Sequence, residues 1–430
     1  MDCTRRIPGF LLGAVEMRFL HLADAHLDRP FSGIQDMPDS MAKLCLKASQ
    51  RAFDRAVALA LENQVDAVLM VGDMFDTARR GVEASLFLRD RLKRLAESEI
   101  PTFLVHGNHD PLDASLSRVS WPSGVHVFPA EDVYQMALKG KDGIECHLYG
   151  ISFASSLVTE NLSTRFPKER TAEVMMGLIH ANVGGRSGHQ NYAPCKESHL
   201  HSKAIDYWAL GHIHKREIFL EDRPKAAYPG MLQGAHIGEL GEGGALLVDI
   251  GPTGPVQTEF VPLSEVVWHD VQVQIESLAD VGELEDAVVQ ALNNTHPGPR
   301  IVRVIVTGRG PVHNELMLRV DQESLLEALR AAVLDLGECW IAKLVNETKP
   351  ELDLEAFIKE ETFTGELLRV AAQLNPGKDM PAQLSERLDV LYANPSFSRL
   401  VSPLDSLDWN RIVDMAQTMV LDRLLKDITP

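Results

Sequence analysis

The sequence is short of the features that most quickly assign a protein to a class. No apolar run approaches the roughly 20 residues that a membrane-spanning helix requires, and we therefore expect no membrane association. Cysteine is scarce and scattered, with no C-x-x-C pair, which argues against a disulfide framework and against a thiolate zinc site. We therefore expect reduced thiols in a cytoplasmic protein. The five cysteines are Cys3, Cys45, Cys146, Cys195 and Cys339.

Positive charge is also in short supply. The chain has 42 Lys and Arg against 61 Asp and Glu, so its net charge is −19. This balance argues against binding of nucleic acid through an overall basic surface, because neutralising phosphates requires Lys and Arg. Net charge bears on solubility and long-range steering, but not on the chemistry of one cleft. A local basic groove or a pair of bound metal ions could still hold DNA.

The length of 430 residues fits one large domain with one or two smaller ones. Residues 1–16 contain Thr4-Arg5-Arg6 and a short apolar stretch, a pattern weakly similar to a twin-arginine export signal. The stretch soon reaches Glu16 and Arg18. We therefore interpret residues 1–16 as an N-terminal extension, with Met17 as the candidate start of the protein.

Near-continuous apolar runs recur along the first 265 residues. Such runs are typical of strands that are buried on both faces of a sheet. Helical patterns lie between them at residues 41–63 and 82–97, and the alternation predicts a layered α/β domain over residues 17–265. Sheets of this kind bind ligands beyond the carboxyl ends of their strands, and five of these runs lead into polar residues. The five runs are residues 17–23, 66–71, 101–106, 175–179 and 205–210.

The pattern changes after Pro262. Residues 266–349 alternate between strand-like and helix-like segments, with helices predicted at 280–293 and 323–336. This predicts a second, small α/β domain without metal-ligand clusters. Residues 350–430 are predicted to be mostly helical, with one amphipathic stripe. This stripe fits packing against the protein's own core, and docking to a partner is the alternative. Its residues are Trp409, Ile412, Val413, Ala416, Val420 and Leu424.

Side chains with ligand chemistry follow the five apolar runs. They offer carboxylate, amide and imidazole donors but no thiolate, a set that suits Mn²⁺, Fe or Zn²⁺ better than Ca²⁺ or Mg²⁺ alone. The donors are too many for one ion and enough for two, which predicts a two-metal site. His21 and His106 lie inside the predicted strands and are expected to be buried without binding metal. The candidate metal ligands are Asp24, His26, Asp73, Asn108, His180, His212 and His214.

Asp73 is the candidate bridge between the two ions, since Gly72 before it lets the backbone come close. The carboxylates of Asp24 and Asp73 contribute about −2 against the +4 of two divalent ions. The surplus of about +2 suits a phosphate group and lowers the pKa of a water molecule between the ions. The sequence therefore indicates metal-assisted hydrolysis of a phosphoester.

His109 directly follows a candidate ligand, so it can lie beside the ions without binding them. It is the candidate general acid for the departing oxygen. A cationic imidazole needs an orienting carboxylate. Asp76, three residues after Asp73, is the first candidate for that role, and Asp110 is the second.

Taken together and in this order, the motifs resemble the five motifs of the calcineurin-like metallophosphoesterases. Within that superfamily the chain resembles the SbcD-type DNA repair exonucleases and, most closely, their YhaO-like bacterial branch. The segments His21–Phe31 and Tyr228–His236 carry this narrower resemblance, which covers residues 17–265 well and the remainder loosely. The motifs are Asp24-x-His26, Gly72-Asp73-x-x-Asp76, Gly107-Asn108-His109-Asp110, His180 and Gly211-His212-Ile213-His214.

The resemblance implies a four-layer α/β/β/α sandwich with a small α/β capping domain and a helical C-terminal tail. It also implies Mn²⁺, His109 as the catalytic histidine, a homodimer, and an SMC-like ABC ATPase partner docked through the C-terminal helices. Met231 and Ala235 depart from the family pattern, which usually has an Asn-like and a basic residue there. The resemblance assigns one metal ion to Asp24, His26, Asp73 and His214, and the other to Asp73, Asn108, His180 and His212.

These observations predict a Mn²⁺-dependent DNA exonuclease or endonuclease. Two alternatives stay open. One is a hydrolase of the same superfamily that acts on a cyclic nucleotide, a nucleotide sugar or a phosphoprotein, although such an enzyme needs no separate region after residue 265. The other is a scaffold subunit that binds DNA ends or an ATPase and cleaves little. No residue is assigned to substrate binding, and the candidates for contacts with a DNA backbone are Arg79, Arg80, Lys215 and Arg216.

Overall fold

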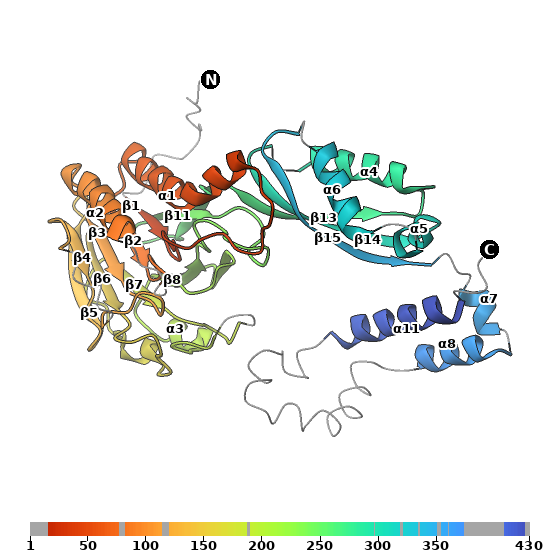
Figure 1. Ribbon diagram of the computed structural model, residues 1–430. Helices are drawn as coiled ribbons and strands as arrows, with labels where there is room; N and C mark the ends of the chain where they lie inside the picture. The colour runs from red at the N-terminus through yellow and green to blue at the C-terminus, as the bar shows by residue number, and fades with distance from the viewer. Residues whose placement is uncertain are drawn as a thin grey trace. The chain divides into compact units, whose positions relative to one another are not determined.

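The structure is a computed structural model (Figure 1), which describes residues 16–76, 82–113, 120–186, 190–295, 297–318, 321–333, 336–350, 354–359, 361–373 and 408–425. The predicted N-terminal extension lies outside these residues except for Glu16. The described residues form two compact units. Unit 1 contains the residues up to Asp270 together with Thr295–Arg303 and Val333–Ala342. Unit 2 contains Val271–Asn294, Val304–Ala332 and the residues from Lys343 onward.

Unit 1 is built on two six-stranded sheets. The first has the order β12-β11-β1-β2-β3-β4, in which β1 to β4 run parallel and β11 and β12 are antiparallel to their neighbours. Its strands are β1 (Met17–Leu22), β2 (Ala67–Val71), β3 (Thr102–Val105), β4 (Val125–Val127), β11 (Gly244–Ile250) and β12 (Gln257–Pro262).

The second sheet has the order β5-β6-β7-β8-β10-β9. Its four central strands run parallel, and the edge strands β5 and β9 are antiparallel. Its strands are β5 (Tyr134–Lys139), β6 (Glu145–Ile151), β7 (Val174–His180), β8 (Tyr207–Gly211), β9 (Glu217–Phe219) and β10 (Lys225–Tyr228).

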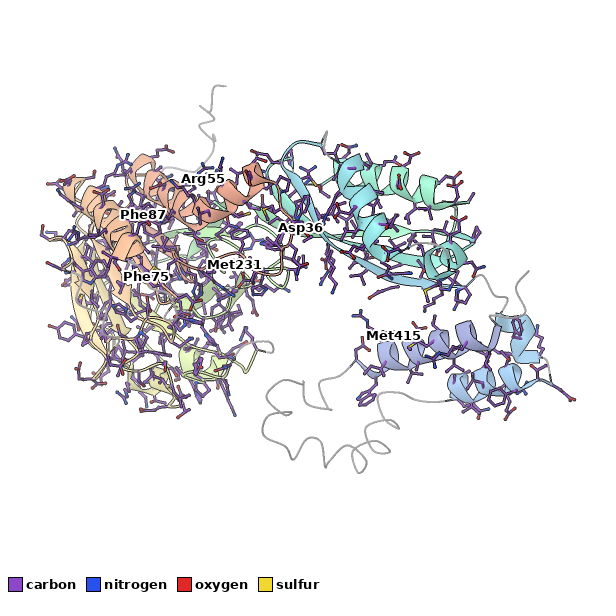
Figure 2. The ribbon with its side chains drawn as sticks, viewed as in Figure 1. Asp36, Arg55, Phe75, Phe87, Met231 and Met415 are labelled. Carbon is purple, nitrogen blue, oxygen red and sulfur yellow. The ribbon has the colours of Figure 1, made fainter. Side chains whose placement is uncertain are left out.

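Two helices cover the outer face of the first sheet: α1 (Asp39–Glu62) and α2 (Val82–Glu97). Leu20 and Met70 point to this helix layer, where Phe75 also lies buried (Figure 2). The next residues along the strands, Phe19 and Leu69, point the other way into a core shared with the second sheet. Both faces of β1 and β2 are therefore buried, which explains why their sequences are apolar without alternation.

The outer face of the second sheet carries a thinner cover. The short helices η1 (Leu162–Arg165) and α3 (Glu197–His201) contribute Leu162 and Leu200 to a third core, which contains Trp208 of β8. Helix, sheet, sheet and helix follow one another, so the predicted four-layer α/β/β/α sandwich is confirmed. The carboxyl ends of the parallel strands in both sheets provide the edge on which the candidate site is built.

A third sheet has the order β13-β14-β15. Its strands are β13 (Val267–Gln274), β14 (Arg300–Arg309) and β15 (Cys339–Lys349), and each contributes residues to both units. In unit 1, Trp268, Ile301 and Trp340 pack with Met41 and Cys45 of α1. The helices of unit 2 beside this sheet are α4 (Val281–Asn293), α5 (Val312–Leu318) and α6 (Gln322–Ala332). Helix α5 was not predicted from the sequence.

The C-terminal part of unit 2 is helical where it is described. Leu368 of α8 and Leu421 of α11 bury each other, and Lys349 forms an ion pair with Asp414 of α11 at 2.5 Å. Several apolar residues of α11 stay exposed, among them Met415 (Figure 2). Of the helices that the structure describes, none is both long and apolar enough to cross a membrane. The C-terminal helices are α7 (Leu354–Lys359), α8 (Phe363–Gln373) and α11 (Trp409–Leu425).

Candidate metal centre

The strand ends bring the predicted ligands together. Strands β1, β2 and β3 end at one edge of the first sheet, and β7 and β8 end at the matching edge of the second. Three groups of side chains place their donor atoms within 4.8 Å of one another. Asp73 belongs to the group that joins ligands of the first sheet to one of the second. The groups are Asp24, His26 and His214; His26, Asp76 and His109; and Asp24, Asp73 and His180.

Two of the glycines that precede these ligands are required by close packing. A Cβ atom at Gly72 would lie 2.2 Å from Nδ1 of His180, and one at Gly107 would lie 2.3 Å from Oδ1 of Asp73. Both distances are far below van der Waals contact, so a side chain at either position would displace a candidate ligand. The glycine in the Gly-Asp and Gly-Asn-His motifs is therefore part of the site geometry.

Several ligand positions have left-handed backbone conformations. The φ angles of Asp24, His26 and Asp73 are 48°, 40° and 54°, and that of His212 is 100°. Non-glycine residues adopt such angles at a cost, and they concentrate at functional sites. Hydrogen bonds hold these turns in place: the N–H of Asp24 donates to the carbonyl of Gly72 at 3.1 Å, and the N–H of His26 to that of Asp73 at 3.0 Å.

One half of the cluster is rich in imidazole. Nε2 of His26 lies 3.4 Å from Nε2 of His214, which is 4.0 Å from Oδ1 of Asp24. Nδ1 of His26 is buried and has no hydrogen-bond partner among the described residues. Burial lowers the pKa of His26 to about 3, so its ring is neutral. A neutral imidazole beside a carboxylate and a second imidazole is a donor set that fits a divalent transition metal ion.

The other half is centred on His180. Its Nε2 lies 3.3 Å from Oδ2 of Asp73 and 3.0 Å from Oδ1 of Asn108. Its Nδ1 donates to the carbonyl of Val71 at 3.1 Å, which directs Nε2 at the cluster. Burial alone would lower the pKa of His180, but the charge of Asp73 raises it to about 9. Positive charge is therefore strongly favoured at this position, as a metal site requires.

Asp24 points to the same conclusion. Burial raises the pKa of this carboxyl group to about 6, because the neighbouring histidines only partly offset the cost of burying a negative charge. A bound cation would supply the missing positive charge. The donors and their electrostatics thus fit divalent metal ions, and the residues placed to hold them are Asp24, His26, Asp73, Asn108, His180 and His214.

His212 lies beside these residues but outside the three converging groups found among the described residues. Its ring stacks edge-on against His180, with centroids 5.2 Å apart, and its Nε2 donates to the carbonyl of Gln190 at 2.7 Å. Nδ1 is then the nitrogen with which His212 could bind a metal ion. Its backbone N–H donates to Asp24 at 3.1 Å, so His212 also braces a ligand of the opposite sheet.

His109 lies at the open side of the cluster. Its side chain is 39% exposed, and its ring centroid is 5.0 Å from that of His26. Nδ1 lies 3.3 Å from Oδ1 of Asp76. Its backbone N–H donates to Oδ1 of Asp73 at 2.8 Å. The imidazole can therefore reach a bound substrate while Asp76 orients it, as expected for a general acid.

The carboxylate of Asp110, the second predicted partner of His109, has a different task. It is buried and accepts three backbone hydrogen bonds, from the N–H groups of Gly107 at 2.8 Å, Met74 at 2.8 Å and Asp73 at 3.2 Å. The side chain thus ties the loop after β2 to the loop after β3. Asp110 supports the position of Asp73 and does not orient His109.

Replacing Asp110 tests this role. Asp110→Asn puts an N–H₂ group where one oxygen accepts, so at least one buried N–H loses its acceptor. We expect the free energy of unfolding to fall by about 1–3 kcal/mol, measured by urea denaturation. Asp249→Asn is the control, since Asp249 pairs with Arg18 at a half-exposed site, where a salt bridge contributes only about 0–1 kcal/mol. Equal stability of the two variants would contradict the assigned role.

The other candidates from the sequence are distributed as follows. His21 is buried and bonds to the Tyr207 hydroxyl and to the carbonyl of Leu210, as expected for a core histidine. His106 donates to the carbonyl of Asp110. Lys215 is exposed and lines a cavity with His214, while the guanidinium of Arg216 lies over the ring of Phe260. Arg79 and Arg80 lie outside the described residues.

One residue of the site was missed by sequence reasoning. Glu239 is buried, and its Oε1 lies 2.6 Å from Nδ1 of His214. It follows β10 in a segment without helical or strand periodicity, and no spacing links it to the motifs. Only its place just after the Tyr228–His236 segment, which carries part of the family resemblance, hints at a role beside the ligands.

Comparison with known proteins agrees with this geometry. Residues 17–216 match the family model described as calcineurin-like phosphoesterase. The chain belongs to this family. Calcineurin-like phosphoesterases are hydrolases of phosphoesters that use two divalent metal ions. Residues 268–349 match the model described as the middle domain of metallophosphoesterase YhaO, which confirms the resemblance of this phosphoesterase to the YhaO-like branch.

Relatives of this calcineurin-like phosphoesterase include a protein of Bacillus subtilis (strain 168) called "Uncharacterized metallophosphoesterase YhaO". It is 29% identical over 417 residues, which is 96% of this chain and 98% of the relative. The "DNA double-strand break repair protein Mre11" of Aeropyrum pernix is 26% identical, covering 66% of this chain and 70% of its own. One of the two subunits of the SbcCD nuclease of Bacillus subtilis is 22% identical, covering 59% and 69%.

Proposed function

We propose that the protein is a two-metal phosphodiesterase that cleaves DNA, with Mn²⁺ as its metal. The observation that carries the proposal is the convergence of nitrogen and oxygen donors from both sheets around the carboxylates of Asp24 and Asp73. Two divalent ions would activate a water molecule and offset the charge of the phosphate. The proposed ligands of one ion are Asp24, His26, Asp73 and His214, and those of the other are Asp73, Asn108, His180 and His212.

The residues around the ions have defined tasks in this proposal. Asp73 links the two halves of the cluster and receives the backbone N–H of His109. His109 donates a proton to the departing oxygen, and Asp76 holds the imidazole in the required orientation. Asn108 approaches His180 from the first sheet, which keeps the two halves in register.

Support for DNA as the substrate comes from the names of two relatives, a double-strand break repair protein and a component of a nuclease. We propose that residues 17–265 form the nuclease domain, residues 266–349 the capping domain, and residues 350–430 the region that docks an SMC-like ABC ATPase. The exposed apolar residues of α11 suit such docking. We also propose a homodimer.

A second candidate is hydrolysis of a smaller phosphoester. Met231 and Ala235, the two positions that depart from the family pattern, are both buried and apolar. They present no positive charge to a phosphate backbone, and the net charge of −19 gives no general attraction to DNA. A substrate with a single phosphodiester depends less on such contacts.

Cleavage of end-labelled linear duplex DNA with Mn²⁺, beside bis-p-nitrophenyl phosphate, tests both candidates. Release of labelled nucleotides is the result expected for a nuclease, and the position of the label gives the polarity. Cleavage of the small diester with intact DNA would favour the second candidate. If neither compound is hydrolysed while Mn²⁺ binds, the protein is a scaffold subunit and not a nuclease.

A further inference from the structure

Glu239 is the hub of a buried polar network beside the metal ligands. Its Oε1 lies 2.6 Å from Nδ1 of His214, 2.9 Å from a guanidinium nitrogen of Arg29 and 3.3 Å from Nε2 of His236. Its Oε2 accepts the N–H of Ala235 at 2.8 Å. The Glu239 side chain is only 5% exposed. Both carboxylate oxygens are therefore committed, and one of the three partners of Oε1 is a candidate metal ligand.

The network fixes which nitrogen of His214 carries a proton. A carboxylate oxygen only accepts, so Nδ1 of His214 carries the hydrogen. In the neutral ring the lone pair then lies on Nε2, the atom that points toward His26 and Asp24. The same logic holds for His236, whose Nδ1 accepts the N–H of Gly238 at 3.0 Å and whose Nε2 therefore donates to Glu239.

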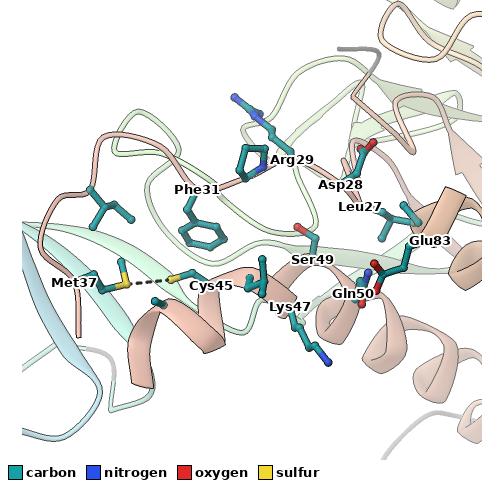
Figure 3. A pocket seen from close by; sticks show the side chains of 15 residues that line it. Leu27, Asp28, Arg29, Phe31, Met37, Cys45, Lys47, Ser49, Gln50 and Glu83 are labelled. Carbon is teal, nitrogen blue, oxygen red and sulfur yellow. Dashed lines mark hydrogen bonds between the residues drawn. The ribbon is translucent and has the colours of Figure 1, made fainter. Parts of the chain in front are cut away.

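Arg29 keeps this network electrically balanced. Burial alone would raise the pKa of Glu239, but the bonds from His214 and His236 and the charge of Arg29 hold it well below its usual range. Glu239 is thus negative, and Arg29 compensates it. Figure 3 shows the side chain of Arg29 directed away from Cys45 and Ser49, which line the neighbouring cavity of about 530 Å³. The added carboxylate does not consume the positive surplus that the ions offer to a phosphate.

We propose that Glu239 is a positioning residue that holds His214 in the Nδ1–H tautomer and so sets the affinity of one of the two metal sites. The proposal rests on the two-metal site described under the proposed function. Carboxylates that accept the second N–H of a metal-binding histidine orient the ring and make it a stronger ligand, and losing them lowers metal affinity by about 10–100-fold.

The test is Mn²⁺ binding by the metal-free full-length protein, followed by the EPR signal of free Mn²⁺. Glu239→Gln keeps the size of the side chain but replaces one oxygen by an N–H₂ group. We expect the affinity of one site to fall by about 10–100-fold while the other changes little. Unchanged binding at both sites would overturn the proposal. No substrate enters this measurement, so a protein that binds two Mn²⁺ ions but leaves DNA intact contradicts the proposed function alone.

A matched control separates positioning from general support. Glu265 is similarly buried, and its carboxylate forms ion pairs with Arg51 and Arg55 of α1, away from the metal ligands. Glu265→Gln should lower thermal stability and leave both Mn²⁺ sites intact, and an equal loss of Mn²⁺ affinity in both variants would contradict a specific role. If Glu239→Gln does not fold, ¹⁵N NMR of the wild-type histidines decides: a predominant Nε2–H form of neutral His214 would overturn the proposal.

Discussion

Asp73→Asn is expected to lower the hydrolysis of DNA and of bis-p-nitrophenyl phosphate by at least about 10³-fold. Two metal ions contribute several kcal/mol to stabilising the transition state, and each 1.4 kcal/mol corresponds to about tenfold in rate. Asp73 lies in the middle of the cluster, 3.3 Å from His180, and its charge acts on both His180 and His26. Removing that charge weakens the binding of both ions.

The Asn variant is chosen so that the protein still folds. Asn tolerates the left-handed conformation that Asp73 adopts at φ 54°, and its amide oxygen can still accept the N–H of His109. Kinetics with Mn²⁺ and EPR titration of Mn²⁺ are measured together. Asp249→Asn serves as the control and should keep full activity, because Asp249 pairs with Arg18 at a distant surface. Substantial turnover with a weakened Mn²⁺ signal would rule out the bridging role.

His109→Gln is expected to lower kcat for DNA by about 10²–10⁴-fold, the usual contribution of a general acid, while leaving Mn²⁺ binding intact. The backbone of His109 is held by Asp73 through its N–H, so the loop position does not depend on the imidazole. The exposed ring is placed to meet a substrate, not to complete the buried donor set. Asp76→Asn should reduce kcat by a smaller factor, because Asp76 acts through His109.

The leaving group provides the discriminating measurement. Nitrophenolate departs without needing a proton, whereas the oxygen of a sugar does not. The loss caused by His109→Gln should therefore be clearly smaller for bis-p-nitrophenyl phosphate than for DNA. His109 also forms a converging group with His26 and Asp76. A variant that loses one Mn²⁺ ion, with equal losses for both substrates, would make His109 a metal ligand instead of an acid.

The strand-end arrangement explains how much of the site could be predicted. Asp24, Asp73 and Asn108 each follow a buried parallel strand, and parallel strands end at a common edge. The layered fold follows from the same runs, because β1 and β2 are apolar on both faces and need a layer on each side. These signals are local in the sequence: an apolar run, a glycine and a donor within a few residues.

The edge strands and short helices carried no comparable signal. Strand β5 has a largely exposed surface, so burial imposes no apolar pattern on it. Helix α5 has only seven residues, too few to display a helical repeat. The C-terminal limit of the predicted helix at 323–336 was also wrong, since α6 ends at Ala332.

The sequence by itself determined the donor set, its order along the chain and the layered fold, because each depends on residues that are close together in the chain. Only the tertiary structure decided which carboxylates serve these donors. Asp110 stands next to His109 in sequence but binds backbone N–H groups of two loops. Glu239 reaches His214 and also Arg29, which is 210 positions away. Such contacts arise from the path of irregular loops across two sheets, and no periodic pattern encodes that path.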